Sequence, residues 1–141
     1  MNDMRFVTLR KAMVDSQIRP NKVIDDQVIE AFSTVPRELF VNRQMQELAY
    51  IDEDLHLSGG RFIIEAMVMA RMVQALKLTP SDNVMCIGAG NGYGAAILSF
   101  LAASVIAVET RIQMVEKAQQ IVAGLDIGNV AVVKSRLQDG Y

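Results

Sequence analysis

A glycine-rich segment near the middle of the chain carries the clearest chemical signal. Glycines alternate with other residues from Gly88 to Gly94, after one short apolar run and before another apolar stretch. Glycine adopts backbone angles that other residues avoid, and the missing side chains at the glycine positions let a ligand lie against the main chain. Because a helix after such a loop directs its free N–H groups at the ligand, the segment predicts a ligand-binding loop.

An acidic residue stands where a nucleoside ligand would need it. Glu109 follows a second apolar run and lies 21 residues beyond Gly88. A carboxylate at the end of that strand accepts hydrogen bonds from both hydroxyls of a ribose. The loop, its flanking elements and the acid at this spacing together predict a ribose-containing cofactor rather than a plain turn.

The spacing of the glycines disfavours a dinucleotide. The dinucleotide fingerprint is Gly-x-Gly-x-x-Gly, and counted from Gly88 the third glycine falls one residue early, at Gly92. Counted from Gly90, the pattern ends in Ala95 and begins too far beyond the strand. A nicotinamide-dependent reductase is therefore the least favoured interpretation.

The elements around the loop alternate in type. Apolar runs that predict buried parallel strands occur at 83–87, 104–108 and 129–133. One helix is predicted over 93–101, and another from Thr110, which forms a capping-box pattern with Gln113, to about Gly124. This alternation is one mononucleotide-binding half of a doubly wound α/β sheet.

The residues before the sheet differ in character. Residues 5–50 predict amphipathic helices, one of them capped by Asp25. Residues 52–60 predict a loop, and 62–78 a helix that is apolar on most sides. The chain therefore divides into an N-terminal helical segment, 1–60, and a sheet segment, 61–141.

Composition and charge exclude several other classes of protein. The formal net charge of −2 gives no electrostatic case for nucleic-acid binding. One cysteine, Cys86, and one histidine, His56, exclude an internal disulfide framework and a metal cluster. No apolar run reaches the ~18 residues of a membrane span, and charges interrupt every candidate signal peptide. A cytoplasmic protein that binds neither membranes nor nucleic acids is expected.

Short motifs along nearly the whole chain resemble one family. Together they are similar to those of protein-L-isoaspartate O-methyltransferases, which are class I S-adenosylmethionine-dependent enzymes. The N-terminal motifs are Met13-Val14, Gln17-Ile18-Arg19, Val35-Pro36-Arg37 with Phe40-Val41, and Ala49-Tyr50. The later motifs, in the family's order, are Ile87-Gly88-Ala89-Gly90-Asn91-Gly92-Tyr93, Ala95-Ala96, Glu109 and Asp139-Gly140.

The resemblance implies a fold, a cofactor and a reaction. The fold is a Rossmann-like three-layer α/β sandwich with an N-terminal helical extension, and the methyl donor is S-adenosylmethionine. Glu109 would hold the ribose, and Asp139 would lie by the adenine amino group. The remaining cofactor contacts would come from Gly88, Ala89, Gly90, Gly92, Tyr93 and Gly140, the glycines of the loop facing the methionine part. The family repairs proteins by methylating the carboxylate of isoaspartyl residues.

Two departures from the family pattern bear on activity. Where the family carries a Gln-Thr-Ile-Ser-Gln-Pro-like segment, Phe62 and Ile64 replace both hydroxyl residues, so the catalytic residues are unassigned. Arg61 could pair with a carboxylate, but an exposed arginine beside a loop is the favoured interpretation. Cys86, where the family usually has an acid, is expected to be a small buried strand residue. We therefore expect weak or no isoaspartyl methylation, and the alternative function is a catalytically inactive S-adenosylmethionine-binding or regulatory module.

The number of strands predicts an unusual sheet. The class I methyltransferase sheet has seven strands, and its fourth pairs with its first, whereas the sequence predicts three parallel strands here. The sheet is therefore expected to be incomplete, with residues 83–87 as an unpaired apolar edge. Such edges promote association, so a longer protein, a partner that supplies strands, or self-association through this edge is expected.

Overall fold

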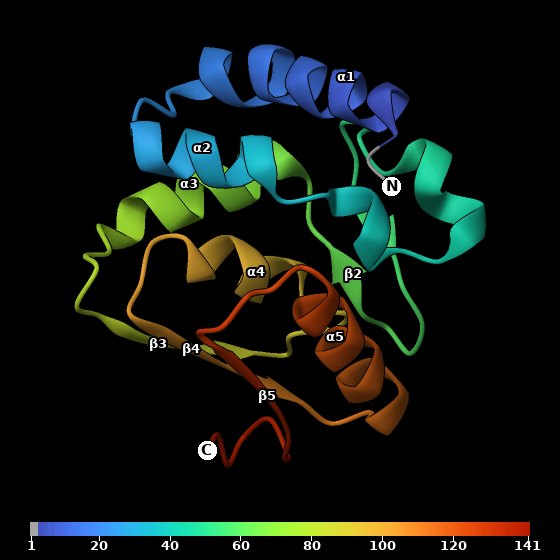
Figure 1. Ribbon diagram of the computed structural model, residues 1–141, viewed down its shortest axis with the longest axis vertical. Helices are drawn as coiled ribbons and strands as arrows, with labels where there is room; N and C mark the ends of the chain where they lie inside the picture. Colours follow the sequence, from blue (N-terminus) through green and yellow to red (C-terminus); the bar gives the residue numbers. More distant parts are fainter. Residues whose placement is uncertain (1–2) are drawn as a thin grey trace.

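The computed structural model describes residues 3–141, in which a helical N-terminal layer covers a small parallel sheet (Figure 1). The first helix, α1 (Met4–Met13), continues into a π-helical turn, η1 (Val14–Ile18), and a 3-10 turn, η2 (Arg19–Asn21). Helix α2 (Asp26–Thr34) follows, and then two 3-10 segments, η3 (Arg37–Phe40) and η4 (Arg43–Leu48). The helical character predicted for residues 5–50 is confirmed.

Asp25 begins α2 as predicted. Its side chain accepts hydrogen bonds from the backbone N–H groups of Gln27 and Val28, at 2.9 and 3.2 Å. These groups have no partner within the helix, so an acidic N-cap satisfies them and complements the positive end of the helix dipole. The cap fixes the direction in which α2 leaves, with Phe32 buried against the rest of the core.

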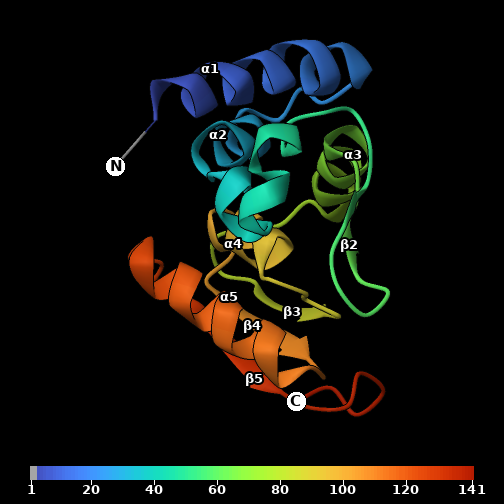
Figure 2. The ribbon, with the colours of Figure 1, turned by 90° about the vertical axis from the view of Figure 1, so that its right-hand side faces the viewer.

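A parallel sheet of three strands forms the second layer. Its strands are β3 (Asn83–Ile87), β4 (Ser104–Glu109) and β5 (Val130–Lys134), in the order β3-β4-β5. Helix α4 (Tyr93–Ser99) connects the first pair and α5 (Ile112–Gly124) the second, and α4 lies between the sheet and the N-terminal helices (Figure 2). The predicted α/β alternation is therefore confirmed, with strand ends that differ by one residue at most.

The segment before α3 was predicted incorrectly. Phe62–Ile63 form strand β2, which pairs antiparallel with β1 (Leu55–His56), and α3 begins only at Ala66 and ends at Leu76. Aromatic and β-branched residues favour extended backbone, and Glu65 is itself extended, with its N–H donated to the Asp54 carboxylate at 2.8 Å. One strand of this short hairpin thus lies in the predicted loop, 52–60, and the other lies in the predicted helix, 62–78.

The capping box predicted for α5 is also wrong. Helix α5 begins after Arg111, which caps it without a side-chain hydrogen bond. The Thr110 hydroxyl instead donates to the carbonyl of Ser135, at 3.3 Å. A tertiary contact with the segment after β5 therefore replaces the local one.

An aromatic cluster joins the helical layer to the sheet layer. The ring of Tyr93, at the start of α4, lies edge-on to those of Phe32 and Phe40, with centroid distances of 6.3 and 5.4 Å. All three side chains are almost fully buried. The buried residues of both layers form one continuous hydrophobic cluster, so the N-terminal helices pack directly on the elements that hold the glycine loop.

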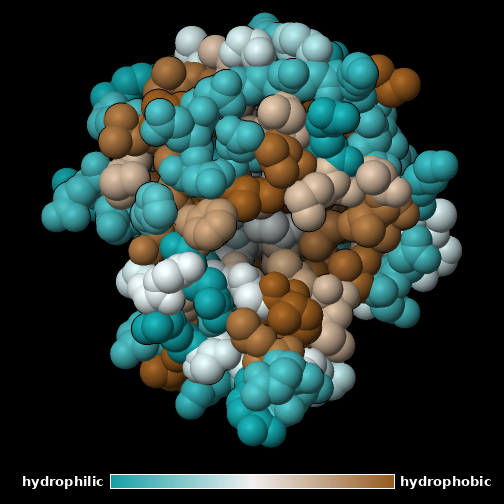
Figure 3. Space-filling view, turned by 180° about the vertical axis from the view of Figure 1, so that it is seen from behind, coloured by the Kyte–Doolittle hydropathy of each residue, from teal (hydrophilic) through white to brown (hydrophobic). Residues whose placement is uncertain are grey.

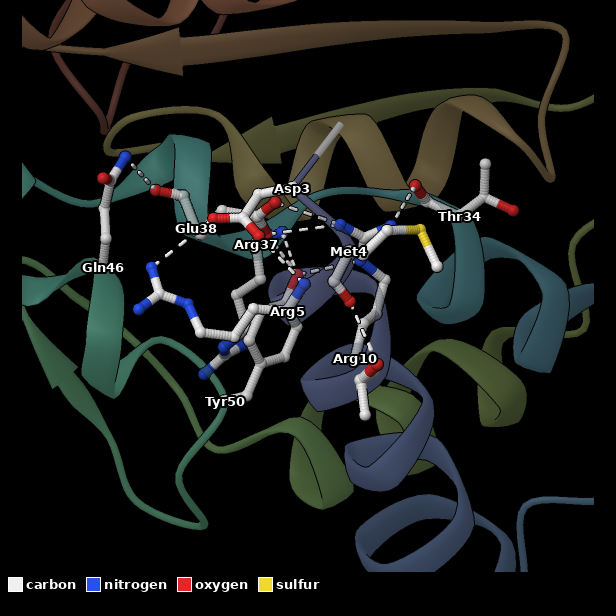
Figure 4. A network of polar contacts seen from close by, with 10 residues as sticks. Asp3, Met4, Arg5, Arg10, Thr34, Arg37, Glu38, Gln46 and Tyr50 are labelled. Atoms are coloured by element: carbon white, nitrogen blue, oxygen red, sulfur yellow. Dashed lines mark hydrogen bonds and ion pairs between the residues drawn. The ribbon is translucent and has the colours of Figure 1, made fainter. Parts of the chain in front are cut away.

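A buried polar network fixes the N-terminal layer (Figure 4). Arg10 donates from Nε to the Tyr50 hydroxyl at 2.8 Å and from Nη2 to the Glu38 carboxylate at 3.1 Å. The Tyr50 hydroxyl in turn donates to Glu38. Burial, and then the hydrogen bond with Glu38, raises the pKa of Tyr50 far above its ordinary value. A charge pair that is buried in this way needs all of these partners.

Arg37 of the Val-Pro-Arg motif connects this network to the chain before α3. Its backbone N–H donates to the Tyr50 hydroxyl at 3.1 Å. Its guanidinium donates from Nε to the carbonyl of Ala49 at 2.7 Å and from Nη2 to that of Ile64 at 3.1 Å. The N-terminal motifs of the sequence thus hold the hairpin and the entrance to α3.

Strand β3 lies at one edge of the sheet. It pairs with β4 on one side, and no other strand among residues 3–141 pairs with it. Met85 and Ile87 of β3 are 42% and 48% exposed, which agrees with the apolar edge predicted for residues 83–87.

No helix among residues 3–141 is long and apolar enough to cross a membrane.

Candidate cofactor site

The glycine loop leaves β3 with a backbone that favours glycine. Gly88 and Gly90 have φ values of +76° and +57°, a region that side chains disfavour. The N–H groups of Gly88 and Ala89 both donate to the carbonyl of Val108, at 2.9 and 3.0 Å. A Cβ added to Gly88 would meet no atom closer than 3.9 Å. The main chain at Gly88 is therefore open on its outer side and anchored to β4 on its inner side.

Gly92 has a different surrounding. Its φ is +98°, and a Cβ placed there would lie 3.2 Å from the Cβ of Ala118 on α5. The absence of a side chain therefore allows α5 to approach the loop. Asn91, which the sequence did not single out, is buried beside it and donates from Nδ2 to the carbonyl of Phe40 at 2.8 Å. This amide anchors the loop to the N-terminal layer.

Glu109 lies at the end of β4, directly beside the loop. Its side chain is fully buried, and Oε2 accepts the N–H of Gly90 at 2.8 Å while Oε1 accepts that of Thr110 at 2.7 Å. The structure thus brings together the loop and the acid that the sequence predicted to act together. They lie 19 residues apart at the point of contact.

Arg61 also binds Glu109, and the expectation of an exposed arginine is wrong. Its Nε and Nη2 lie 3.0 Å from Oε2 and Oε1 of Glu109, in a bidentate ion pair. Burial by itself would raise the pKa of the Glu109 carboxyl, but the hydrogen bonds from Arg61, Gly90 and Thr110 outweigh it and hold the pKa below its ordinary value. Glu109 is therefore an anion at neutral pH.

A groove of about 520 Å³ begins at the loop and runs between β3 and α3. One end is formed by Gly88, Ala89 and Gly90, and its lining is otherwise mainly apolar, with Phe62 and Ile64 on the hairpin side. Apolar side chains gather on the same face of the molecule (Figure 3). The groove can exclude water from a ligand, and the side chains of Phe62 and Ile64 offer that ligand no hydrogen bond.

Tyr93 and Cys86 line the groove, and both are buried or half-buried. Tyr93 is 1% exposed, and its hydroxyl has no hydrogen-bond partner among the described residues. Cys86 lies half-buried in β3, where burial, and then the charge of Glu109, raises the pKa of its thiol. A thiol that stays protonated is a poor nucleophile, which agrees with the prediction of a small strand residue.

Asp139 and Gly140 lie after β5, beside the sheet. Asp139 is exposed, and its carboxylate pairs with Arg136 at 2.6 Å. Gly140 has a φ of +63°, and a Cβ there would lie 3.2 Å from the sulfur of Met85. Leu137 of the same segment comes close to Gly88. The segment thus passes the mouth of the groove, with the Asp139 carboxylate directed to a neighbour three residues away.

Comparison with known proteins identifies relatives over nearly the whole chain. A sequence profile described as Protein-L-isoaspartate(D-aspartate) O-methyltransferase matches residues 8–141. Protein-L-isoaspartate O-methyltransferase 2 of an Anaeromyxobacter species is 38% identical over 95% of this chain, and Protein-L-isoaspartate O-methyltransferase 1 of Rhodopseudomonas palustris is 39% identical over 90%. The chain covers 54% and 52% of these two relatives, so it spans about half of their length.

Solved structures agree with the sequence comparison. A protein-L-isoaspartate O-methyltransferase superposes with a TM-score of 0.83 and 26% identity, over 94% of this chain and 44% of its own. A putative protein-L-isoaspartate O-methyltransferase from Plasmodium falciparum, in complex with S-adenosyl-L-homocysteine, shares the fold, with a TM-score of 0.71, 19% identity and coverage of 96% and 64%. The chain therefore belongs to the protein-L-isoaspartate(D-aspartate) O-methyltransferase family.

Proposed function

We propose that this protein binds S-adenosylmethionine at the glycine loop and transfers its methyl group to a protein carboxylate, that of an isoaspartyl residue. The observation that carries the proposal is the junction of Gly90 and Glu109, where an open main chain and a buried carboxylate meet at 2.8 Å. Family membership supports the choice of methyl donor, since S-adenosyl-L-homocysteine, found in the Plasmodium falciparum structure, is what the donor becomes after transfer.

Each predicted site residue receives a role in this proposal. The open main chain of Gly88, Ala89 and Gly90 faces the methionine part of the donor, and Glu109 accepts the ribose hydroxyls. Gly92 lets α5 approach the loop, Tyr93 lines the groove below it, and Gly140 lets the segment after β5 pass close to Met85. Asp139 meets the adenine amino group after turning away from Arg136, to which its carboxylate is bound in the structure.

The chemistry requires positioning more than it requires proton transfer. S-adenosylmethionine supplies a methyl group on a positively charged sulfur. The acceptor's carboxylate oxygen forms a bond to the methyl carbon in line with the breaking carbon–sulfur bond, whose electron pair stays on sulfur. A carboxylate is already an anion, so no general base is needed. The chain contributes by holding the two reactants close together and by excluding water with the apolar walls of the groove.

A second candidate function is a binding or regulatory module without turnover. Phe62 and Ile64 line the groove where the family has hydroxyl residues, and Phe62 is 48% exposed. Neither side chain can hydrogen-bond an acceptor peptide. This observation favours slow transfer or none, and it does not concern the loop and Glu109, where the methyl donor is proposed to bind.

Calorimetry and a transfer assay separate the two functions. S-adenosylmethionine should bind the chain, and Gly88→Val should weaken binding at least about tenfold, because the side chain is strained at positive φ and covers the open main chain. Gly128→Val is the control, since a Cβ at Gly128 would meet no atom within 4 Å and Gly128 lies far along the sequence, in a turn before β5. Tritium transfer to an isoaspartyl peptide above background supports the enzyme. Binding without transfer supports the module, and no heat with either protein rejects both.

A further inference from the structure

Glu109 has no free acceptor position in this structure. Oε2 accepts from Gly90 N–H and from Nε of Arg61, and Oε1 accepts from Thr110 N–H and from Nη2 of Arg61. A longer contact, 3.4 Å from Arg111 N–H to Oε1, adds a fifth donor. A carboxylate has about four lone-pair positions. Two ribose hydroxyls can therefore bind Glu109 only if existing donors leave.

Arg61 is the donor that is able to leave. The other donors are backbone N–H groups, fixed by the loop and by the end of β4. Arg61 holds its position by a side chain that is 24% exposed, in the turn of the hairpin directly after Gly59 and Gly60. Both glycines have positive φ; a Cβ at Gly59 would collide with the guanidinium of Arg111, whereas a Cβ at Gly60 would meet open space. Solvent can therefore receive the guanidinium when it separates from Glu109.

A displaced guanidinium has a place to act. Nε of Arg61 lies 4.0 Å from the position of a Cβ on Gly88, so the side chain stands over the end of the groove. The groove residues themselves carry no charged side chain. A carboxylate that enters this apolar groove needs a cation, because an unpaired anion is costly away from water. Arg61 presents a planar fork that matches a carboxylate with two hydrogen bonds.

We propose that Arg61 exchanges partners: it holds Glu109 until the ribose of the methyl donor takes that carboxylate, and it then binds the carboxylate of the methyl acceptor. Arg61 thereby determines specificity for an acceptor that carries a carboxylate. Its charge takes the place of the hydroxyl contacts that Phe62 and Ile64 cannot make. This inference rests on the proposed binding of the methyl donor by Glu109.

The exchange predicts opposite effects of one substitution on two ligands. Adenosine, which has the ribose but no carboxylate, should bind Arg61→Ala about five- to tenfold more tightly than the unmodified protein, because no competing side chain has to leave. A short isoaspartyl peptide should bind the unmodified protein several-fold more tightly when adenosine is present, and adenosine should gain the same factor from the peptide. In Arg61→Ala this mutual gain should vanish.

Arg5→Ala is the matched control. It removes an arginine from an ion pair with Glu47, at 2.8 Å, in the N-terminal layer, and should change neither affinity. A second measurement needs no substitution. The ¹⁵N-bound Nε–H signal of Arg61 should be protected from solvent before titration and should shift and lose protection as adenosine saturates the protein.

The outcomes distinguish this inference from the proposed function. Equal or weaker adenosine binding by Arg61→Ala, an Arg61 signal that stays unchanged at saturation, or peptide affinity that is independent of adenosine overturns the partner exchange. Adenosine binding to neither protein overturns the proposed function, and the exchange falls with it. Tighter binding by the variant together with loss of the mutual gain establishes the exchange.

Discussion

At the scale of single residues, Glu109 connects the local chemistry to the candidate function. It is buried without being isolated, since two backbone N–H groups and one guanidinium lie within 3.0 Å of its oxygens. These donors hold the pKa of the carboxyl below its ordinary value. The same residue thus stabilises the loop and presents an anion at its edge.

Replacement of Glu109 by Gln should destabilise the fold in a pH-dependent way. Glutamine turns one oxygen into an amino group, which then faces either Gly90 N–H or Thr110 N–H, and a lost buried hydrogen bond costs about 1–3 kcal/mol. Because the pKa of Glu109 is lower in the folded state, its charge stabilises the fold at pH values above the pKa of the unfolded chain. This stabilisation is lost as the pH falls through the pKa of the folded state. The stability gap between the two proteins should therefore be widest near neutral pH and close in acid.

Urea denaturation from pH 7 down to about pH 3 measures this gap. Arg5→Ala again provides a comparison, because it breaks an exposed ion pair of the kind that contributes little. A gap between the unmodified protein and Glu109→Gln that stays constant over this range would show that the charge of Glu109 does not stabilise the fold.

At the scale of elements, the approach of α5 to the loop depends on Gly92. Gly92→Ala places a Cβ 3.2 Å from that of Ala118, at a φ of +98°. Strain at such an angle and the displaced helix together predict a loss of about 1–3 kcal/mol. Gly124→Ala within α5 meets open space and should instead stabilise by about 0.4–1 kcal/mol. Thermal denaturation of the two variants tests the contrast, and equal melting temperatures would refute it.

The sequence predicted the elements better than it predicted their ends and contacts. The three strands were predicted because buried parallel strands are continuous apolar runs. Phe62 and Ile63 have the same apolar character as α3, so the hydrophobic pattern does not separate the hairpin from the helix, whereas the pairing with Leu55 and His56 does. That pairing is not visible in a hydrophobic pattern.

The site shows the same division. Gly88 and Glu109 could be predicted, since their spacing reflects one strand–helix–strand unit. The pairing of Arg61 with Glu109 could not be, because 48 residues separate them, and no local rule selects one arginine as the partner of a distant acid. Asn91 gave a weak signal, as a polar residue inside a glycine loop, but its acceptor at Phe40 lies 51 residues away.

At the scale of the whole molecule, the edge strand β3 predicts association. Met85 is 42% exposed on this strand, and unpaired apolar edges favour contact with another chain. Met85→Lys should lower the mass measured by light scattering at high protein concentration, because a charge on an edge opposes pairing. Met4→Lys, at an exposed methionine of α1 far along the sequence, should leave the mass unchanged. A monomer at all concentrations in the unmodified protein would contradict the prediction.

The tie between Asn91 and the carbonyl of Phe40 has a consequence for motion. A ligand that reduces the motion of the loop should also reduce the motion of η3, because the amide of Asn91 and the ring of Tyr93 both contact Phe40. Deuterium uptake by the backbone of residues 37–41 should therefore slow when S-adenosylmethionine saturates the protein, although no proposed ligand contact lies there. Asn91→Ala should reduce that slowing while uptake at Gly88 still responds, because only the contact between the rings of Phe40 and Tyr93 remains. Ligand binding at the loop would in this way change the dynamics of the helical layer, although no proposed ligand contact lies in that layer.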